Sequence, residues 1–228
     1  MFAPYAPETE AWARKAQRVV SGLDVSTRRH GNTWFVGVDA LPNASDGSID
    51  GVVMPFHGLA PDWHRAQVSI VYAGYPQQDD GESDAAHAFR RNRCAAHMDG
   101  LLPEGPQKRR HLREPHGFIL GIPLSNVAAS PLVVWEGSHR VMQAAFRRAF
   151  EGVAPKDYGD IDVTDIYQAA RKSVFETCPQ TTVIPKLGEA VLLHRHLIHG
   201  VAPWDGPAVE QGRQVVYFRP MIDPARWV

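Results

Sequence analysis

Cysteine is scarce in this chain, and so are long apolar runs and charge of one sign. Only Cys94 and Cys178 occur, without a CxxC partner, which argues against a disulfide scaffold or a cysteine-rich zinc site and favours free thiols in a reducing compartment. No stretch approaches the 18 apolar residues of a membrane span, and the segment MFAPYAPETEAWARK has no signal-peptide core. We therefore expect a cytoplasmic protein that does not insert into membranes.

The charges are balanced, with 24 Lys and Arg against 25 Asp and Glu. Without a basic field the chain has no general attraction for nucleic acid or for an anionic membrane. The 228 residues are 44% apolar and 21% charged, an ordinary composition for a globular protein. They fit one domain over residues 1–228.

Glycine and proline are frequent, at 19 and 18 residues, and many turns imply short strands. We expect a mainly β protein with flanking helices, in which an antiparallel core closes as a barrel, a sandwich or a jelly roll. A helical flank is expected at about 8–20, and a helical insertion at about 141–176. The strand candidates are 33–38, 68–72, 92–98, 118–124, 131–135, 190–198 and 214–219.

The first motif with chemical potential is His97-Met98-Asp99. In an extended segment, residues two apart point to the same side, so His97 and Asp99 can converge on one point. An imidazole and a carboxylate are two of the three ligands in the facial triad of non-haem Fe(II) oxygenases. The motif is short, and a solvated histidine beside a solvated aspartate is the alternative.

A second motif, GEAVLLHRHLIHG, places His194, His196 and His199 within an apolar strand. Buried histidines need partners or a function. Further on, Arg213 opens the apolar strand RQVVYF. A guanidinium matches a carboxylate with two parallel hydrogen bonds, while an arginine in solvent at the end of a strand is the alternative.

The order and spacing of these motifs carry more information than each motif alone. His199 follows Asp99 after 100 positions, and Arg213 follows His199 after 14. Between them, FILGIPLSNVAASPLVVWEGSH resembles an apolar segment that ends in Pro-Gly-Ser-His, with Glu136 in place of proline. In this layout, from about Cys94 to Pro220, the chain resembles the Fe(II)/2-oxoglutarate-dependent dioxygenases, and among them the phytanoyl-CoA dioxygenase-like family.

That resemblance implies a double-stranded β-helix, the cupin-like jelly roll, with catalytic metal ligands His97, Asp99 and His199. Arg213 would bind the distal carboxylate of 2-oxoglutarate. The implied activity uses Fe(II), 2-oxoglutarate and O2 to oxidise a small-molecule substrate, with release of succinate and CO2. Halogenating relatives lack the carboxylate ligand, so Asp99 favours hydroxylation.

Four further residues are candidates for the site. His194 either reaches the co-substrate or supports the ligands from behind, and a satisfied core histidine is equally compatible with its position. Arg109, Arg110 and Arg113 form the one local basic run. They would clamp an anionic group of the substrate, with a solvated loop as the alternative.

Two other functions stay open at this point. A cupin-like metal enzyme that does not use 2-oxoglutarate would keep the histidine and aspartate ligands but would not need Arg213. A non-catalytic jelly roll would bind metal without turnover. The sequence does not indicate the oligomeric state.

Overall fold

The computed structural model describes residues 2–228, and β-strands dominate it. The strands are β1 (Phe2–Ala3), β2 (Trp34–Gly37), β3 (Gln67–Val71), β4 (Leu101–Glu104), β5 (Arg109–Leu112), β6 (Phe118–Pro123), β7 (Leu132–Trp135), β8 (Gln180–Val183), β9 (Ala190–His194), β10 (His199–Val201) and β11 (Arg213–Phe218). The helices are α1 (Pro7–Val20), α2 (Asp84–Asn92), α3 (Ser138–Ala149) and α4 (Thr164–Thr177), with short 3-10 turns at 57–59, 155–160 and 224–226.

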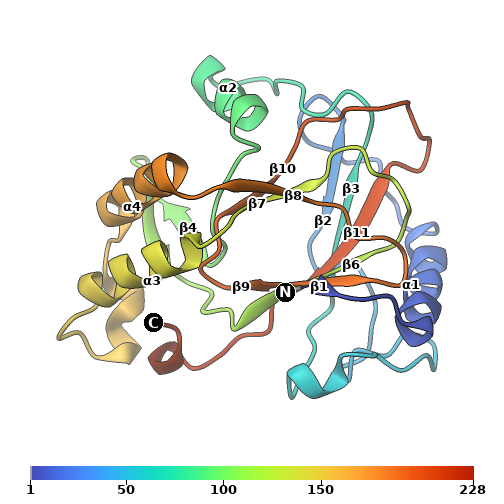
Figure 1. Cartoon of the computed structure of the whole chain (residues 1–228), viewed down its shortest axis with the longest axis horizontal. Coiled ribbons are helices and arrows are strands. Elements are labelled where there is room, and N and C mark those ends of the chain that lie inside the picture. Colours follow the sequence, from blue (N-terminus) through green and yellow to red (C-terminus); the bar gives the residue numbers. More distant parts are fainter. Residues whose placement is uncertain (1) are drawn as a thin grey trace.

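Two antiparallel sheets face each other between the helices (Figure 1). The larger sheet has the order β1-β9-β6-β11-β3-β2, and the smaller one the order β10-β7-β8. The chain leaves the larger sheet at β6, forms β7 and β8 in the smaller one, and then alternates between the sheets through β9, β10 and β11. This alternation is the double-stranded β-helix, or jelly roll, that the sequence predicts.

The outer face of the larger sheet is covered by α1. Trp12, Ala13 and Ala16 have no exposed surface and pack with Ile122 and Phe218 of the sheet. Because side chains alternate along a strand, this packing assigns the even-numbered residues of β6 and β11 to the outer face. The odd-numbered residues of these strands therefore line the space between the sheets.

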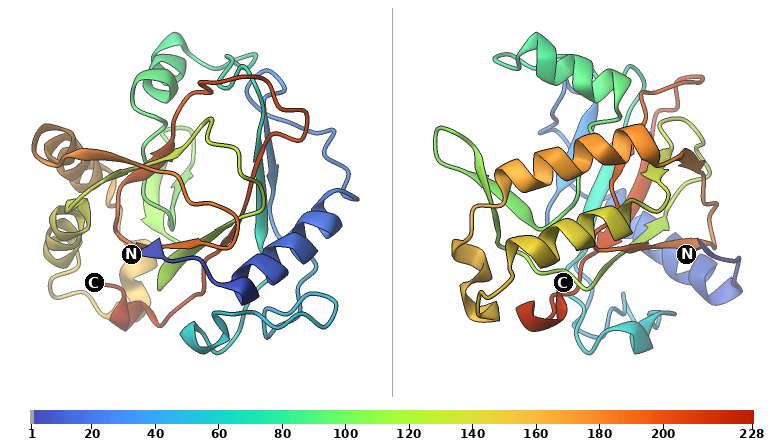
Figure 2. Two further views of the ribbon diagram at one scale, coloured as in Figure 1. Left: turned by 45° about the vertical axis from the view of Figure 1, so that its right-hand side comes forward. Right: turned by 60° about the vertical axis from the view of Figure 1, so that its left-hand side comes forward.

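The outer face of the smaller sheet is covered by α3 and α4, which lie side by side (Figure 2). Val133 and Trp135 of β7 pack there against Met142 and Phe146 of α3. The other face of the same strand contributes to a separate apolar cluster inside the barrel, which consists of Ile119, Leu132, Val134, Val191 and Leu193. The interior is therefore apolar toward β9, and polar residues enter it from β3, β10 and β11.

The strand predicted at 92–98 was wrong, because only the single bridge at His97 remains there. No element was predicted just before it, where α2 forms with no buried residue. The polar stretch after residue 100 folds into the β4–β5 hairpin. Within the smaller sheet, β8 was not foreseen, because its sequence QTTV has no apolar run.

Among the described residues, no helix is long and apolar enough to cross a membrane. The cytoplasmic location and the single domain over 1–228 stay predictions.

Trp12 provides a test of how α1 is held on the sheet. It is completely buried, and its indole Nε1 donates a hydrogen bond to the carbonyl of Gly47. We expect Trp12→Ala to lower the free energy of unfolding by about 3–5 kcal/mol, because it leaves a cavity at the sheet. Urea denaturation measures this change.

The control for this prediction is Arg14→Ala on the same helix, which removes only an exposed ion pair with Glu10. It should change the stability far less than Trp12→Ala. Equal effects of the two substitutions would contradict the docking of α1 through Trp12.

Candidate metal centre

His97, Asp99 and His199 come together in space, each offering one ligand atom within 4.8 Å of the others. The Nε2 atom of His97 lies 3.1 Å from Oδ1 of Asp99, and Nε2 of His199 lies 3.9 Å from the same oxygen. About half of the His97 side chain is exposed, while Asp99 and His199 are largely buried. Two imidazole nitrogens and one carboxylate oxygen thus converge at a point that is open on one side.

The two histidines meet because their backbones pair directly. The amide of His97 donates to the carbonyl of His199, and the amide of His199 donates back to His97, at 2.9 and 3.0 Å. Next to them, a Cβ on Gly200 would lie 2.1 Å from the carbonyl oxygen of Cys94. Only glycine therefore lets the segment before His97 lie against β10, which gives the His199-Gly200 pair a structural reason.

Each histidine ring is oriented by a neighbouring backbone carbonyl. Nδ1 of His97 lies 2.9 Å from the oxygen of Ala95, and Nδ1 of His199 lies 2.9 Å from the oxygen of Leu197. A carbonyl only accepts, so both Nδ1 atoms carry a hydrogen. This arrangement fixes the tautomer that presents Nε2 as a metal ligand.

Asp99 lies in a turn rather than in a strand, and Gly100 follows it with a φ of +88°. Its Oδ2 atom accepts a hydrogen bond from Nε of Arg219, at 2.5 Å. The convergence of His97 with Asp99 is thus confirmed, but the extended backbone assumed from their spacing was wrong. Arg219 was not among the candidates from the sequence, although it follows Arg213 at an odd-numbered position just beyond the end of β11.

The protonation of the three residues follows from their surroundings. Burial lowers the pKa of His199 to about 4, so this ring is neutral near pH 7. Burial opposes the charge of Asp99, but the Arg219 guanidinium and the two histidines hold the pKa of this carboxyl well below its usual range. Burial likewise opposes the charge of His97, yet its hydrogen bond to Asp99 raises the pKa of that imidazole.

Arg213 points into the interior of the barrel, as the odd-numbered residues of β11 do. Its side chain is buried, with the residue only 5% exposed, and Nη1 has no hydrogen-bond partner among the described residues. A strand-end arginine in solvent, the alternative given by the sequence, is therefore wrong. A buried guanidinium with a free donor is suited to bind an anionic group that enters the barrel.

His194 lies on the other face of its strand. It shares that face with Ala190 and Leu192, whereas Val191 and Leu193 line the interior. Its ring lies 5.0 Å from that of His139 and 5.3 Å from that of His196, between ring centroids. The prediction that His194 contacts a co-substrate inside the barrel is therefore corrected. Side chains alternate along the strand, and this alternation turns the His194 ring away from the interior.

The basic run after residue 108 is engaged within the protein. Arg109 pairs with Asp162 and Asp165, and Arg113 pairs with Glu104. Arg110 donates to the carbonyl of Leu101 and lies over the ring of Tyr167. These arginines link the β4–β5 hairpin to α4 and to the segment before it. Because their donors are bound by protein partners, they do not support the predicted binding of an anionic substrate group.

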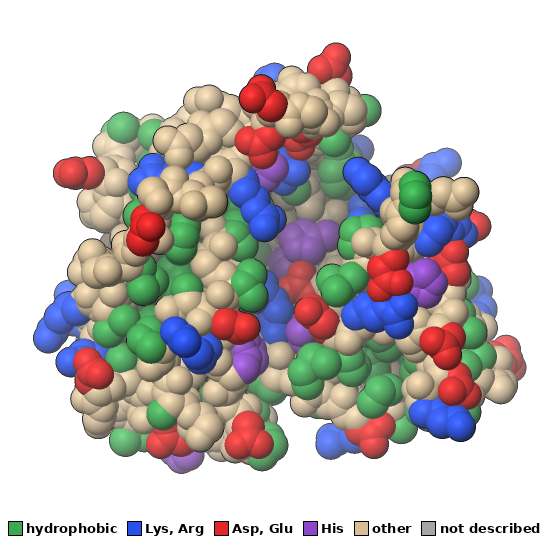
Figure 3. Space-filling view, turned by 180° about the vertical axis from the view of Figure 1, so that it is seen from behind, with side chains coloured by type: hydrophobic (Ala, Val, Ile, Leu, Met, Phe, Trp, Pro, Cys, Tyr) green, Lys and Arg blue, Asp and Glu red, His purple; other side chains and the backbone are tan. Residues whose placement is uncertain are grey.

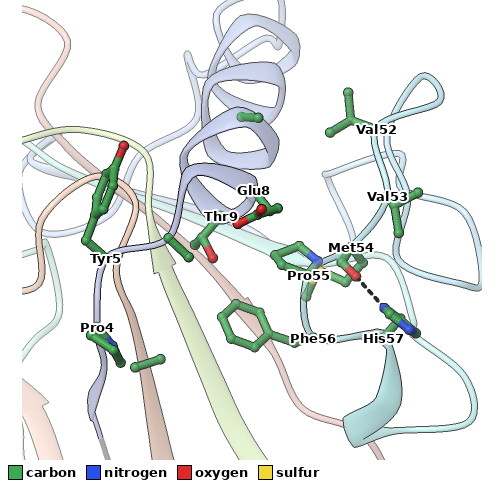
Figure 4. Close-up of a pocket in the computed structure, with 13 residues that line it drawn as sticks. Pro4, Tyr5, Glu8, Thr9, Val52, Val53, Met54, Pro55, Phe56 and His57 are labelled. Carbon is green, nitrogen blue, oxygen red and sulfur yellow. Dashed lines mark hydrogen bonds between the residues drawn. The ribbon is translucent and has the colours of Figure 1, made fainter.

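The surface of the molecule has a polar hollow on one face and a separate, mostly apolar cavity elsewhere. One face carries a hollow in which histidine, acidic and basic side chains gather (Figure 3). A second, mostly apolar cavity of about 680 Å³ lies between the start of α1 and residues 52–57, where His57 donates to the carbonyl of Met54 (Figure 4). None of the three candidate ligands lines this second cavity.

Comparisons with known proteins yielded likenesses to solved structures alone, since no family model and no curated protein matches the chain. The chain is similar to the non-haem alpha-ketoglutarate-dependent carbocyclase SnoK from nogalamycin biosynthesis, with 15% identity, 96% of this chain and 79% of SnoK covered, and a TM-score of 0.48. The chain is also similar to AviO1 from Streptomyces viridochromogenes Tue57, with 17% identity and a TM-score of 0.41. This match covers 96% of the chain and 89% of AviO1.

A third similar structure is the non-haem iron oxygenase OrfP in complex with Fe and alpha-ketoglutaric acid. Here the identity is 13%, the TM-score is 0.30, and 55% of this chain is covered. The aligned part spans half of the length of OrfP.

Metal binding at this centre should release a proton near neutral pH. His199 is already neutral and Asp99 already ionised, so His97 is the ligand that must lose a proton. We expect Co(II) affinity to increase with pH until His97 has titrated, and about one proton to be released at pH 6. Calorimetry in buffers of different ionisation enthalpy measures this number.

Binding that is independent of pH between 5.5 and 8, or without proton release, would contradict this assignment of charges. His199→Ala serves as the control, because loss of a ligand should remove the Co(II) signal at every pH.

Proposed function

We propose that this protein is a non-haem Fe(II)- and 2-oxoglutarate-dependent oxygenase acting on a small molecule. One observation carries the proposal: the two-histidine, one-carboxylate set opens toward solvent on one side, in a barrel whose interior also holds a buried arginine with a free donor. This ligand set with open positions is diagnostic of the facial triad in such oxygenases.

The donor set fits Fe(II). His97 and His199 each present Nε2, with Nδ1 bonded to a carbonyl, and Asp99 presents Oδ1 toward both rings. With iron and 2-oxoglutarate bound, the site would supply the oxidising power for attack on a C–H bond, with succinate and CO2 as by-products. The protein's part is to hold the ligands, orient the co-substrate and limit access of water.

Arg213 is the residue that would hold the far carboxylate of 2-oxoglutarate. Burying a guanidinium is unfavourable unless an anion accompanies it, and the free Nη1 atom is available for that partner. In the larger sheet Arg213 lies in register with Val71 of β3, which in turn lies in register with Trp34 of β2.

Arg213 also separates the main proposal from the cupin-like alternative. A metal enzyme that does not use 2-oxoglutarate has no need of a buried arginine with a free Nη1 donor in the barrel. Only a measurement of turnover can exclude the other alternative, a jelly roll that binds metal without catalysis.

The finer parts of the proposal rest on the sequence motifs. They are the phytanoyl-CoA dioxygenase-like family, hydroxylation as the outcome, and a small-molecule substrate. The carboxylate of Asp99 supports hydroxylation over halogenation, because it occupies the ligand position that a halide would need. The prediction of an anionic substrate group is no longer supported, because the arginines expected to bind it are paired within the protein.

Substitution of Arg213 tests the role of this residue. We expect Arg213→Gln to weaken 2-oxoglutarate binding by about 10- to 100-fold, the loss of one charge-assisted hydrogen-bonded pair, and to leave Co(II) affinity nearly unchanged. Arg213→Lys should fall between, because it keeps the charge but not the planar fork. Calorimetric titration of the Co(II)-loaded protein with 2-oxoglutarate measures the effect, and an equal loss of metal and 2-oxoglutarate affinity would contradict it.

Turnover tests the activity itself. The wild-type protein with Fe(II), 2-oxoglutarate and ascorbate should show a weak visible absorption band without O2, and should form succinate once O2 is admitted. His199→Ala should abolish both signals. If the folded wild-type protein shows neither the band nor succinate, the proposed function is wrong.

A further inference from the structure

The three candidate metal ligands differ in how their side chains are held. His97 and His199 are paired through their backbones, and each ring is fixed by a carbonyl two residues earlier in the chain. Asp99 lies in a turn outside this pairing. The terminal torsion of a carboxylate is broad, so the orientation of Oδ1 toward the two imidazoles depends on what binds Oδ2.

That partner is Arg219, which lies just after β11. Its Nε atom donates to Oδ2 of Asp99, while Oδ1 stays directed at Nε2 of His97 and of His199. The two carboxylate oxygens thus have separate tasks: one is bound by the guanidinium, and the other faces the open metal position.

Arg219 is itself held by contacts on several sides. Its Nη1 atom donates to Oε1 of Gln67, at 2.8 Å, and its backbone amide donates to Nε2 of His64, at 2.7 Å. The guanidinium also lies over the ring of Tyr217, 5.3 Å from its centroid. Gln67 opens β3 and pairs in register with Tyr217 of β11, so two strands of the larger sheet fix the guanidinium.

We propose that Arg219 is a positioning residue of the metal centre: it sets the carboxylate of Asp99 so that Oδ1 completes the triad, with Gln67 steadying the guanidinium from β3. This inference rests on the proposed function and adds to it a residue outside the three ligands. It also joins the larger sheet, through β3 and β11, to a centre whose histidines pair at the smaller sheet.

Charge and geometry predict opposite results when Arg219 is replaced. A cation beside the ligands repels a divalent metal, so removing its charge alone would tighten metal binding. If Arg219 positions Asp99, its removal instead frees the carboxylate and weakens binding. Loss of groups that orient metal ligands typically weakens metal affinity by about 10- to 100-fold.

The test is Co(II) affinity, measured by calorimetry on the folded full-length protein without 2-oxoglutarate. We expect Arg219→Gln to weaken Co(II) binding by about 10- to 100-fold and to change the visible spectrum of the bound Co(II). Arg219→Lys should weaken it less, because one donor and the charge remain. Gln67→Leu should cause a smaller loss in the same direction.

The matched control is Arg148→Gln, the same substitution at an exposed arginine of α3. It should leave both the Co(II) affinity and the spectrum unchanged. Circular dichroism melts separate a folding defect from a metal-binding defect; if Arg219→Gln does not fold, Arg219→Lys and Gln67→Leu provide the test.

Unchanged or tighter Co(II) binding in the folded Arg219 variants would overturn the inference. Normal affinity in both Arg219→Lys and Gln67→Leu would do the same. If the wild-type protein binds Co(II) but forms no succinate, the proposed function fails while the effect of Arg219 on metal affinity still supports its positioning role. A wild-type protein that binds no Co(II) would overturn both.

Discussion

The backbone pairing between His97 and His199 is the contact on which the candidate centre depends. It brings a loop that follows an exposed helix against β10 of the smaller sheet, and it is possible only because Gly200 leaves room for the carbonyl of Cys94. Once the two backbones are joined, local carbonyls turn both rings so that Nε2 points outward as a ligand. Two of the three ligands are therefore set by main-chain geometry.

The support of Asp99 and the buried position of Arg213 both depend on β11 and the residue that follows it. Even-numbered residues of this strand pack against α1, and odd-numbered residues face the interior. Arg213 opens β11 and Arg219 directly follows its last residue, both at odd-numbered positions, so this segment supplies two guanidinium groups to the inside of the barrel. Arg219 is neutralised by Asp99, whereas Arg213 has a free donor. This difference separates a residue that holds a ligand from one that can receive an anion.

Other candidates from the sequence fail for reasons that the same geometry explains. His194 lies in the apolar strand as expected. It shares the strand face of Ala190 rather than that of Val191, so it points away from the interior. The arginines after residue 108 look free as a linear run. In the folded chain Arg109 meets Asp162 and Asp165, more than fifty residues away, and those carboxylates occupy its donors.

Hydrophobic periodicity, a local property of the chain, was enough to indicate an antiparallel β core and the strands around 68–72, 118–124 and 131–135. The jelly roll and the grouping of His97, Asp99 and His199 followed from the resemblance that the order and spacing of the motifs carry. The turn at Asp99, the outward face of His194 and the pairing of Arg219 with Asp99 could not be read there. Each of them depends on which distant segments become neighbours: Asp99 and Arg219 are 120 residues apart, and only the folded barrel places their side chains within hydrogen-bond distance.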